Sequence, residues 1–183
     1  MSYESIVEEY NRRRCVKSDI WEHMPLLRNY AAQARRVVEF GVAHGNSTWS
    51  LLAGKPEWMR SYDVERFDPY WQEIEAAVGG SEINFEFKLQ SSTAELIEPA
   101  DLLFIDSKHT YEHCSLELRM QSPQVSGFII LHDTTTLAEV GDYYKGRGLW
   151  PAIEEFLKAN DKWRMRKRYT NCNGLTILER VSP

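Results

Sequence analysis

Short apolar runs alternate with amphipathic or polar segments along most of the chain. Five such runs lie at residues 37–42, 59–64, 85–89, 102–105 and 128–131. The segments between them have the apolar spacing of helices or the composition of turns. This alternation is typical of crossover units on a parallel sheet, so we predict five parallel strands with helices packed against them.

Three of these runs are apolar almost throughout, with the sequences VVEFGV, DLLFID and GFIILHD. Strands that are buried on both faces have this composition, so these three are expected in the middle of the sheet. Near the end of the chain, segments 163–169 and 175–178 flank Asn173-Gly174, a dipeptide typical of tight hairpins. The prediction is an α/β fold with a doubly wound, mostly parallel, seven-stranded sheet that ends in an antiparallel hairpin.

The first part of the chain has the pattern of two helices. Ile6, Val7 and Tyr10 recur at helical spacing in a segment that ends near the arginines at 12–14. A second helix is predicted from Pro25 to about residue 34, because proline is favoured in a first helical turn. We expect these helices, within residues 1–34, to cover the core or the site.

Length and charge limit the kinds of protein that this chain can be. Its 183 residues, 43% apolar and 27% charged, suffice to bury a core, and we expect one domain over residues 1–183. The formal net charge is -5, and the basic residues form only short runs. Nucleic acid is therefore not an expected partner.

The sequence also predicts where the protein is found. No run approaches the roughly 20 apolar residues that a membrane-spanning helix needs, and the first residues, MSYESIVEEY, do not resemble a secretion signal. Three widely spaced cysteines argue against a disulfide framework. We expect a cytoplasmic protein without a membrane partner; whether it forms a homo-oligomer stays open.

The most informative segment is RVVEFGVAHGNST at residues 36–48, in which an apolar strand breaks into a loop that opens a helix. Gly41 and Gly45 allow a sharp turn and a close approach to a ligand, because neither has a β-carbon. The helix that starts near Ser47 directs free N–H groups toward the loop, which suits an anionic group. A tight turn without a ligand is the alternative.

Polar residues also follow the next two predicted strands. Asp63 ends the second strand, roughly 20 residues after the glycine loop, where nucleotide-binding folds place an acid on the ribose hydroxyls. Ser91 and Ser92 follow the third strand, where small polar residues could hold an adenine edge. All these positions are at the carboxyl ends of strands, where open α/β sheets bind ligands.

Three motifs lie at the ends of predicted strands: VEFGVAHGNST at 38–48, IDSKHTYE at 105–112 and SGFIILHD at 126–133. They resemble those of class I S-adenosylmethionine-dependent methyltransferases, in particular the cephalosporin-hydroxylase-like and the macrolide-sugar and rhamnosyl O-methyltransferases, and the resemblance spans about residues 25–180. It implies a Rossmann-like fold and S-adenosylmethionine as cofactor. The cofactor-binding residues that follow from the motifs and the strand ends are Glu39, Gly41, Gly45, Ser47, Asp63, Ser91 and Asp106.

The chain departs from these families at two places. Ser107-Lys108 stands where the subgroup has glycine and an acid, and His44 occupies a loop position that is often small or polar. These departures concern the substrate more than the cofactor. A nicotinamide-dependent oxidoreductase would require a GxGxxG loop, which this segment lacks.

The candidate catalytic residues are Asp106, His109, His132 and Asp133, which we expect to meet because two neighbouring parallel strands end at the two aspartates. Methyl transfer from a sulfonium needs alignment of the acceptor and removal of its proton. One hypothesis is that Asp106, His132 and Asp133 bind a cation such as Mg²⁺. Another is that His109 or His132 acts as the base and an aspartate orients it.

Two other interpretations of this cluster are a purely structural role and a zinc peptidase. Asp133 and Thr134 could simply end a strand, with His132 as a satisfied core histidine. A zinc peptidase is not expected, because no glutamate directly follows His109, as the metalloprotease motif requires. The leading hypothesis is transfer of a methyl group to a hydroxyl of a small molecule or sugar; the alternative is a noncatalytic nucleotide-binding or scaffold protein that retains the fold.

Overall fold

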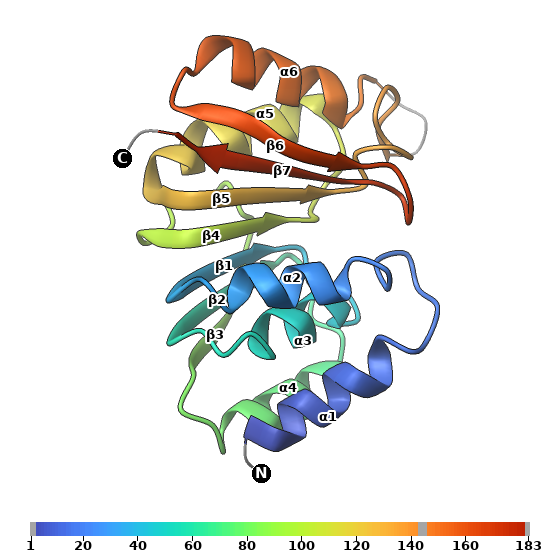
Figure 1. Cartoon of the computed structure of the whole chain (residues 1–183), viewed down its shortest axis with the longest axis vertical. Helices are drawn as coiled ribbons and strands as arrows, with labels where there is room; N and C mark the ends of the chain where they lie inside the picture. Colours follow the sequence, from blue (N-terminus) through green and yellow to red (C-terminus); the bar gives the residue numbers. More distant parts are fainter. Residues whose placement is uncertain (1–2, 143–145, 182–183) are drawn as a thin grey trace.

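The computed structural model describes residues 3–142 and 146–181, arranged as a sheet between helices (Figure 1). The helices are α1 Tyr3–Arg13, α2 Met24–Ala31, α3 Asn46–Leu52, α4 Tyr70–Val78, α5 Tyr111–Gln121, the short 3-10 helix η1 Ser122–Gln124 and α6 Leu149–Ala159. The strands are β1 Arg36–Phe40, β2 Trp58–Asp63, β3 Asn84–Leu89, β4 Ala100–Ile105, β5 Val125–His132, β6 Trp163–Tyr169 and β7 Leu175–Arg180.

The sheet has seven strands in the order β3-β2-β1-β4-β5-β7-β6. Strands β1 to β5 run parallel, while β7 lies antiparallel between β5 and β6. The predicted fold class is therefore confirmed. The three nearly continuous apolar runs form the neighbours β1, β4 and β5 at the centre, as their composition predicts.

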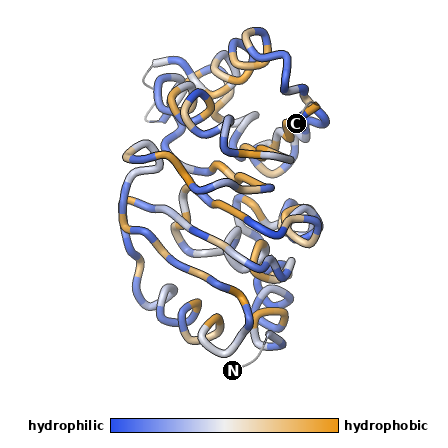
Figure 2. The backbone as a smooth tube through the Cα atoms, turned by 90° about the vertical axis from the view of Figure 1, so that its left-hand side faces the viewer, coloured by the Kyte–Doolittle hydropathy of each residue, from blue (hydrophilic) through white to orange (hydrophobic). Residues whose placement is uncertain are grey.

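Successive residues of the central strands alternate between two hydrophobic cores. Val37 and Phe104 face the core formed with α1 to α4, whereas Val38 and Leu103 face the core formed with α5 and α6. Figure 2 shows hydrophobic residues along the strands, and helices on which hydrophobic and hydrophilic residues alternate. Because the side chains of a strand alternate in direction, a strand that is apolar almost throughout is buried on both faces.

The N-terminal helices lie on one face of the sheet. α1 packs on α3 and α4, with Ile6 and Tyr10 buried, and α2 packs on α3. α2 ends at Ala31, earlier than the predicted residue 34, because Gln33 and Ala34 donate to the carbonyls three residues before them and the chain turns into β1. That residues 1–34 cover a ligand site stays a prediction. Within 3–142 and 146–181, no helix has the length and apolar character needed to cross a membrane.

Candidate active site

A cavity of about 790 Å³ lies at the carboxyl edge of the sheet, among the loops that follow β1, β2, β3 and β4. Five of the residues predicted from the sequence line it: Gly41, Asp63, Ser91, Asp106 and His109. The other five predicted residues are buried and outside the lining: Glu39, Gly45, Ser47, His132 and Asp133. The structure therefore brings the predicted residues to one edge but in two layers, one at the cavity wall and one behind it.

The glycine loop needs glycine at the first of its two positions for steric reasons. Gly41 has φ +82°, and a β-carbon there would lie 2.0 Å from the carbonyl oxygen of Asp106. Its N–H donates to the carbonyl of Tyr62, and the N–H of Asp106 donates to that of Phe40. The absence of a side chain thus lets the end of β1 approach the end of β4, and both Gly41 and Asp106 line the cavity.

Asp63 holds the glycine loop in place. Its Oδ2 accepts hydrogen bonds from the backbone N–H groups of Val42 (2.7 Å) and Ala43 (3.1 Å), and its Oδ1 accepts one from Glu65 (3.1 Å). The sequence did not predict this loop contact, although the carboxylate also lines the cavity. The expected hydrogen bond between Asp63 and a ribose stays a prediction. The same carboxylate already fixes the glycine loop.

Glu39 and Ser47 lie below the loop and outside the cavity lining. The Oε2 of Glu39 accepts hydrogen bonds from Ser61 Oγ (2.6 Å) and Thr48 Oγ1 (2.9 Å). Its Oε1 has no hydrogen-bond partner within the described part of the chain. Burial raises the pKa of Glu39 to about 7, although hydroxyls of Ser47, Ser61 and Thr48 act in the opposite direction.

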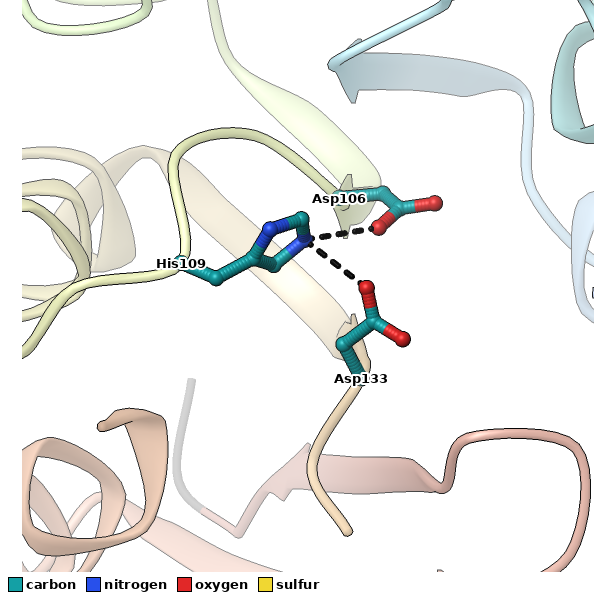
Figure 3. Close-up of side chains that lie close together, drawn as sticks. All are labelled: Asp106, His109 and Asp133. Atoms are coloured by element: carbon teal, nitrogen blue, oxygen red, sulfur yellow. Dashed lines mark hydrogen bonds and ion pairs between the residues drawn. The ribbon is translucent and has the colours of Figure 1, made fainter. Parts of the chain in front are cut away.

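The cluster at the end of β4 and β5 joins two carboxylates through one imidazole (Figure 3). Nε2 of His109 lies 3.1 Å from Asp106 Oδ1 and 3.1 Å from Asp133 Oδ2. One potential ligand atom from each residue fits within 4.8 Å of the others. Asp133 has φ +57°, and its Oδ1 is buried without a hydrogen bond to any described residue. The cluster can therefore share a proton, or hold a cation in its place.

Asp142, which the sequence analysis did not single out, orients His109. Its carboxylate accepts the backbone N–H of His109 at 2.8 Å and lies 3.2 Å from Nδ1 of the ring. The two residues are 33 positions apart, and Asp142 lies in the segment between β5 and α6. No spacing motif links them, so the sequence holds no signal for this contact.

His132 lies behind the cluster. Its Nδ1 is 3.3 Å from Asp106 Oδ1, and its Nε2 is 3.2 Å from the carbonyl oxygen of Cys172, in the turn between β6 and β7. Its side chain has no solvent exposure. The group with ligand-like geometry contains His109 where the sequence-based hypothesis has His132, because the imidazole of His132 already bridges Asp106 and the turn.

Electrostatic interactions between the carboxylates and the imidazoles determine the protonation of the cluster. Burial by itself would lower the pKa values of His109 and His132, but the neighbouring carboxylates outweigh it and raise both to about 9. Burial would raise the pKa of Asp106, yet the two imidazoles hold it well below its ordinary value. Burial and the nearby Asp106 raise the pKa of Asp133. In the absence of ligands the imidazoles are thus protonated at neutral pH.

The sequence model of one protein family, described as a methyltransferase domain, matches residues 38–134. This match covers more than half of the chain and includes the glycine loop and the ends of β4 and β5. The chain belongs to the methyltransferase-domain family. The predicted methyltransferase assignment is therefore confirmed. A search of curated proteins finds no match to the chain.

Solved structures share the fold of this methyltransferase at low sequence identity. A protein from Corynebacterium glutamicum is 16% identical, with a TM-score of 0.70 over 98% of this chain and 91% of that one. TomG from Streptomyces achromogenes, an O-methyltransferase of tomaymycin synthesis crystallised with SAM, is 15% identical, with a TM-score of 0.62 over 98% and 90%. An O-methyltransferase from Bacillus cereus, in complex with SAH, is 17% identical, with a TM-score of 0.60 over 96% and 90%. They confirm the Rossmann-like methyltransferase fold.

Proposed function

We propose that this methyltransferase transfers a methyl group from S-adenosylmethionine to a hydroxyl of a small molecule or sugar. The observation that carries the proposal is a ligand-sized cavity that ends at the group formed by Asp106, His109, His132 and Asp133, the acid–histidine cluster. Asp106 and His109 belong to this cluster and also line the cavity. Its volume, about 790 Å³, is within the range of small-molecule sites. The structural relatives from Bacillus cereus and Streptomyces achromogenes, crystallised with SAH and SAM, support the same cofactor here.

The residues present fit this cofactor. Gly41 leaves the backbone of the loop open to the cavity, and Asp63 and Ser91 offer polar groups on the neighbouring loops. Tyr62 and Phe67 add aromatic surface to the same wall. Glu39, Gly45 and Ser47 act in this proposal from behind the loop, where Glu39 accepts the hydrogen bonds that hold α3 against β2.

Methyl transfer from this cofactor requires little chemistry from the protein itself. The bound cofactor supplies a methyl group on a sulfonium, which is already an activated leaving group. The protein has to align the acceptor oxygen and take up its proton, and an oriented acid–base group contributes about 10²- to 10⁴-fold to such a step. Asp106, His109, His132 and Asp133 are the groups that we assign to this task, with Asp142 holding His109 in position. Because both imidazoles are protonated at neutral pH, a carboxylate takes up the proton, and Asp133, whose pKa is raised, is the stronger base of the two aspartates.

The cluster also fits a divalent cation. Asp106, His109 and Asp133 offer two carboxylate oxygens and one imidazole nitrogen within 4.8 Å. A cation there would supply Lewis acidity to the acceptor hydroxyl. Mg²⁺ prefers oxygen ligands throughout, so the imidazole favours a metal such as Mn²⁺ or Zn²⁺. Titration of Mn²⁺ into chelator-treated protein tests the site directly, and activity unchanged after exhaustive chelation would exclude a catalytic cation.

The decisive experiment separates cofactor binding from transfer. Calorimetry with S-adenosylhomocysteine measures binding, while release of S-adenosylhomocysteine from S-adenosylmethionine, in the presence of alcohols, phenols and sugars, measures transfer. We expect Asp133→Asn to lower turnover by about 100-fold or more and to retain binding, because Asp133 lies outside the cavity lining. Asp161→Asn, which changes an exposed aspartate, is the matched control.

Each outcome of this experiment decides between the two functions. A wild-type protein that does not bind S-adenosylhomocysteine would refute the proposed cofactor. Binding without transfer to any acceptor class would support the noncatalytic nucleotide-binding alternative. Transfer that survives both Asp106→Asn and Asp133→Asn would contradict the role assigned to the cluster.

A further inference from the structure

A second polar network lies at the wall of the cavity and is separate from the acid–histidine cluster. Its centre is Glu117 of α5, which has no solvent exposure. The Oε1 of Glu117 accepts hydrogen bonds from Ser92 Oγ at 2.5 Å and Ser107 Oγ at 2.6 Å, and it lies 3.2 Å from Nε2 of His113. Its Oε2 is buried without a hydrogen-bond partner among the residues described.

The network gathers side chains from three segments at one place. Ser92 follows β3, Ser107 follows β4, and His113 and Glu117 lie one helical turn apart on α5. Ser92, Ser107 and His113 line the cavity, whereas Glu117 lies behind them. Burying a carboxylate is costly unless it is paired and hydrogen-bonded, and an apolar residue would fill the same space without that cost. The placement indicates a role toward a ligand.

The hydrogen bonds fix the direction in which the serine hydroxyls point. A carboxylate oxygen only accepts, so both serines donate their single proton to Glu117. Ser92 Oγ also lies 3.1 Å from His113 Nε2, which donates to it in the Nε2–H tautomer. The serine oxygens therefore have only lone pairs left for a ligand in the cavity. Toward the cavity, the hydroxyl groups of Ser92 and Ser107 therefore accept hydrogen bonds and do not donate them.

We propose that Glu117 is a positioning residue that makes Ser92 and Ser107 select the amino edge of a purine. The inference rests on the proposed function, because it concerns the base of the same cofactor. Adenine presents an exocyclic amino group, which donates hydrogen bonds, whereas a 6-oxo purine presents an acceptor at that position. Two acceptors facing a carbonyl leave buried groups unpaired, at a penalty that corresponds to about 10- to 100-fold in affinity.

The test compares two ligands that differ only at this edge of the base, in the group on C6 and in the proton that a 6-oxo purine carries on N1. The affinities of S-adenosylhomocysteine and S-inosylhomocysteine are measured by calorimetry, and their ratio is the readout, since a merely structural role of Glu117 would change both affinities together. We expect the wild-type protein to prefer the adenosyl compound by about 10-fold or more. Glu117→Met keeps much of the volume but frees both serine protons, so the ratio should fall close to one. Glu117→Gln retains an acceptor oxygen and should restore part of the preference.

A milder variant and a control keep the test decisive. Ser107→Ala removes one acceptor and leaves Glu117 in place, and it should lower the ratio several-fold even if Glu117→Met fails to fold. Glu112→Gln changes an exposed glutamate on the same helix and should leave the ratio unchanged. Equal affinities in the wild-type protein, or an unchanged ratio in Ser107→Ala, would overturn the inference. Absence of S-adenosylhomocysteine binding would instead refute the proposed function.

Discussion

Replacement of Glu39 by glutamine should make the protein progressively more stable than the wild type as the pH rises. Glutamine keeps the oxygen that accepts hydrogen bonds from Ser61 and Thr48, but it removes the ionisable group. The amide nitrogen takes the place of an oxygen without a hydrogen-bond partner in the described structure. This adds a cost that does not depend on pH, so the pH dependence of the difference is the signal.

The expected magnitude follows from the pKa of Glu39. Burial raises this pKa from 4.5 to about 7. Between these values the unfolded chain releases a proton that the folded chain retains, so the contribution of Glu39 to stability falls as the pH rises from about 4.5 through about 7. At about 1.4 kcal/mol for each pKa unit, the loss amounts to about 3 kcal/mol. The glutamine variant does not undergo it, so its relative stability should rise by this amount.

Urea unfolding followed by tryptophan fluorescence measures the difference at pH 4.5, 6 and 8. Other groups that titrate in this range are common to both proteins and cancel. Glu82→Gln, at a side chain that is 91% exposed, reports the effect of losing one surface carboxylate. A Glu39→Gln difference that varies by less than about 1 kcal/mol over this range would refute the argument that burial sets the protonation of Glu39.

Three further predictions concern the loop, the cluster and the core. Gly41→Ala should destabilise the protein by about 3 kcal/mol and abolish S-adenosylhomocysteine binding, because its β-carbon would lie 2.0 Å from the carbonyl oxygen of Asp106; unchanged urea unfolding would contradict this. Asp142→Asn should lower turnover by about 10-fold through misorientation of His109, and kcat values equal to wild type would exclude that role. Trp71→Ala, at a fully buried side chain between α4 and β3, should cost about 3–5 kcal/mol in urea unfolding, and a loss below about 1 kcal/mol would show that this contact does not stabilise the fold.

The fold could be predicted largely because strands that are buried on both faces have a recognisable, almost entirely apolar sequence. Runs that are apolar almost throughout became β1, β4 and β5, and the Asn173-Gly174 step became the turn of the hairpin. Strand β3 is different, since its residues are partly exposed and it lies at the edge of the sheet. The insertion of β7 next to β5 depends on pairing between segments distant in sequence, which no local pattern encodes.

The site could be predicted where it depends on strand ends and not where it depends on loops. Asp106 and Asp133 meet because they end neighbouring parallel strands, a relation that the sequence pattern contains. Asp142 reaches His109 from the connection between β5 and α6, so only the structure shows the contact. Glu117 left a weak signal, because it belongs to the buried stripe of α5, where polar residues are unusual.

Glu39 and Glu117 play comparable parts, Glu39 behind the glycine loop and Glu117 behind the cavity wall. Each is fully buried, and each accepts hydrogen bonds from hydroxyl groups of two different segments, while its second oxygen has no hydrogen bond to the described residues. A carboxylate placed one layer behind the wall directs hydroxyl groups without exposing its own charge to a ligand. The two networks differ in whether their hydroxyl groups line the cavity. Those bound to Glu39 support the loop, whereas those bound to Glu117 line the cavity. Changes at Glu39 should therefore affect stability first, whereas changes at Glu117 should affect which purine is bound.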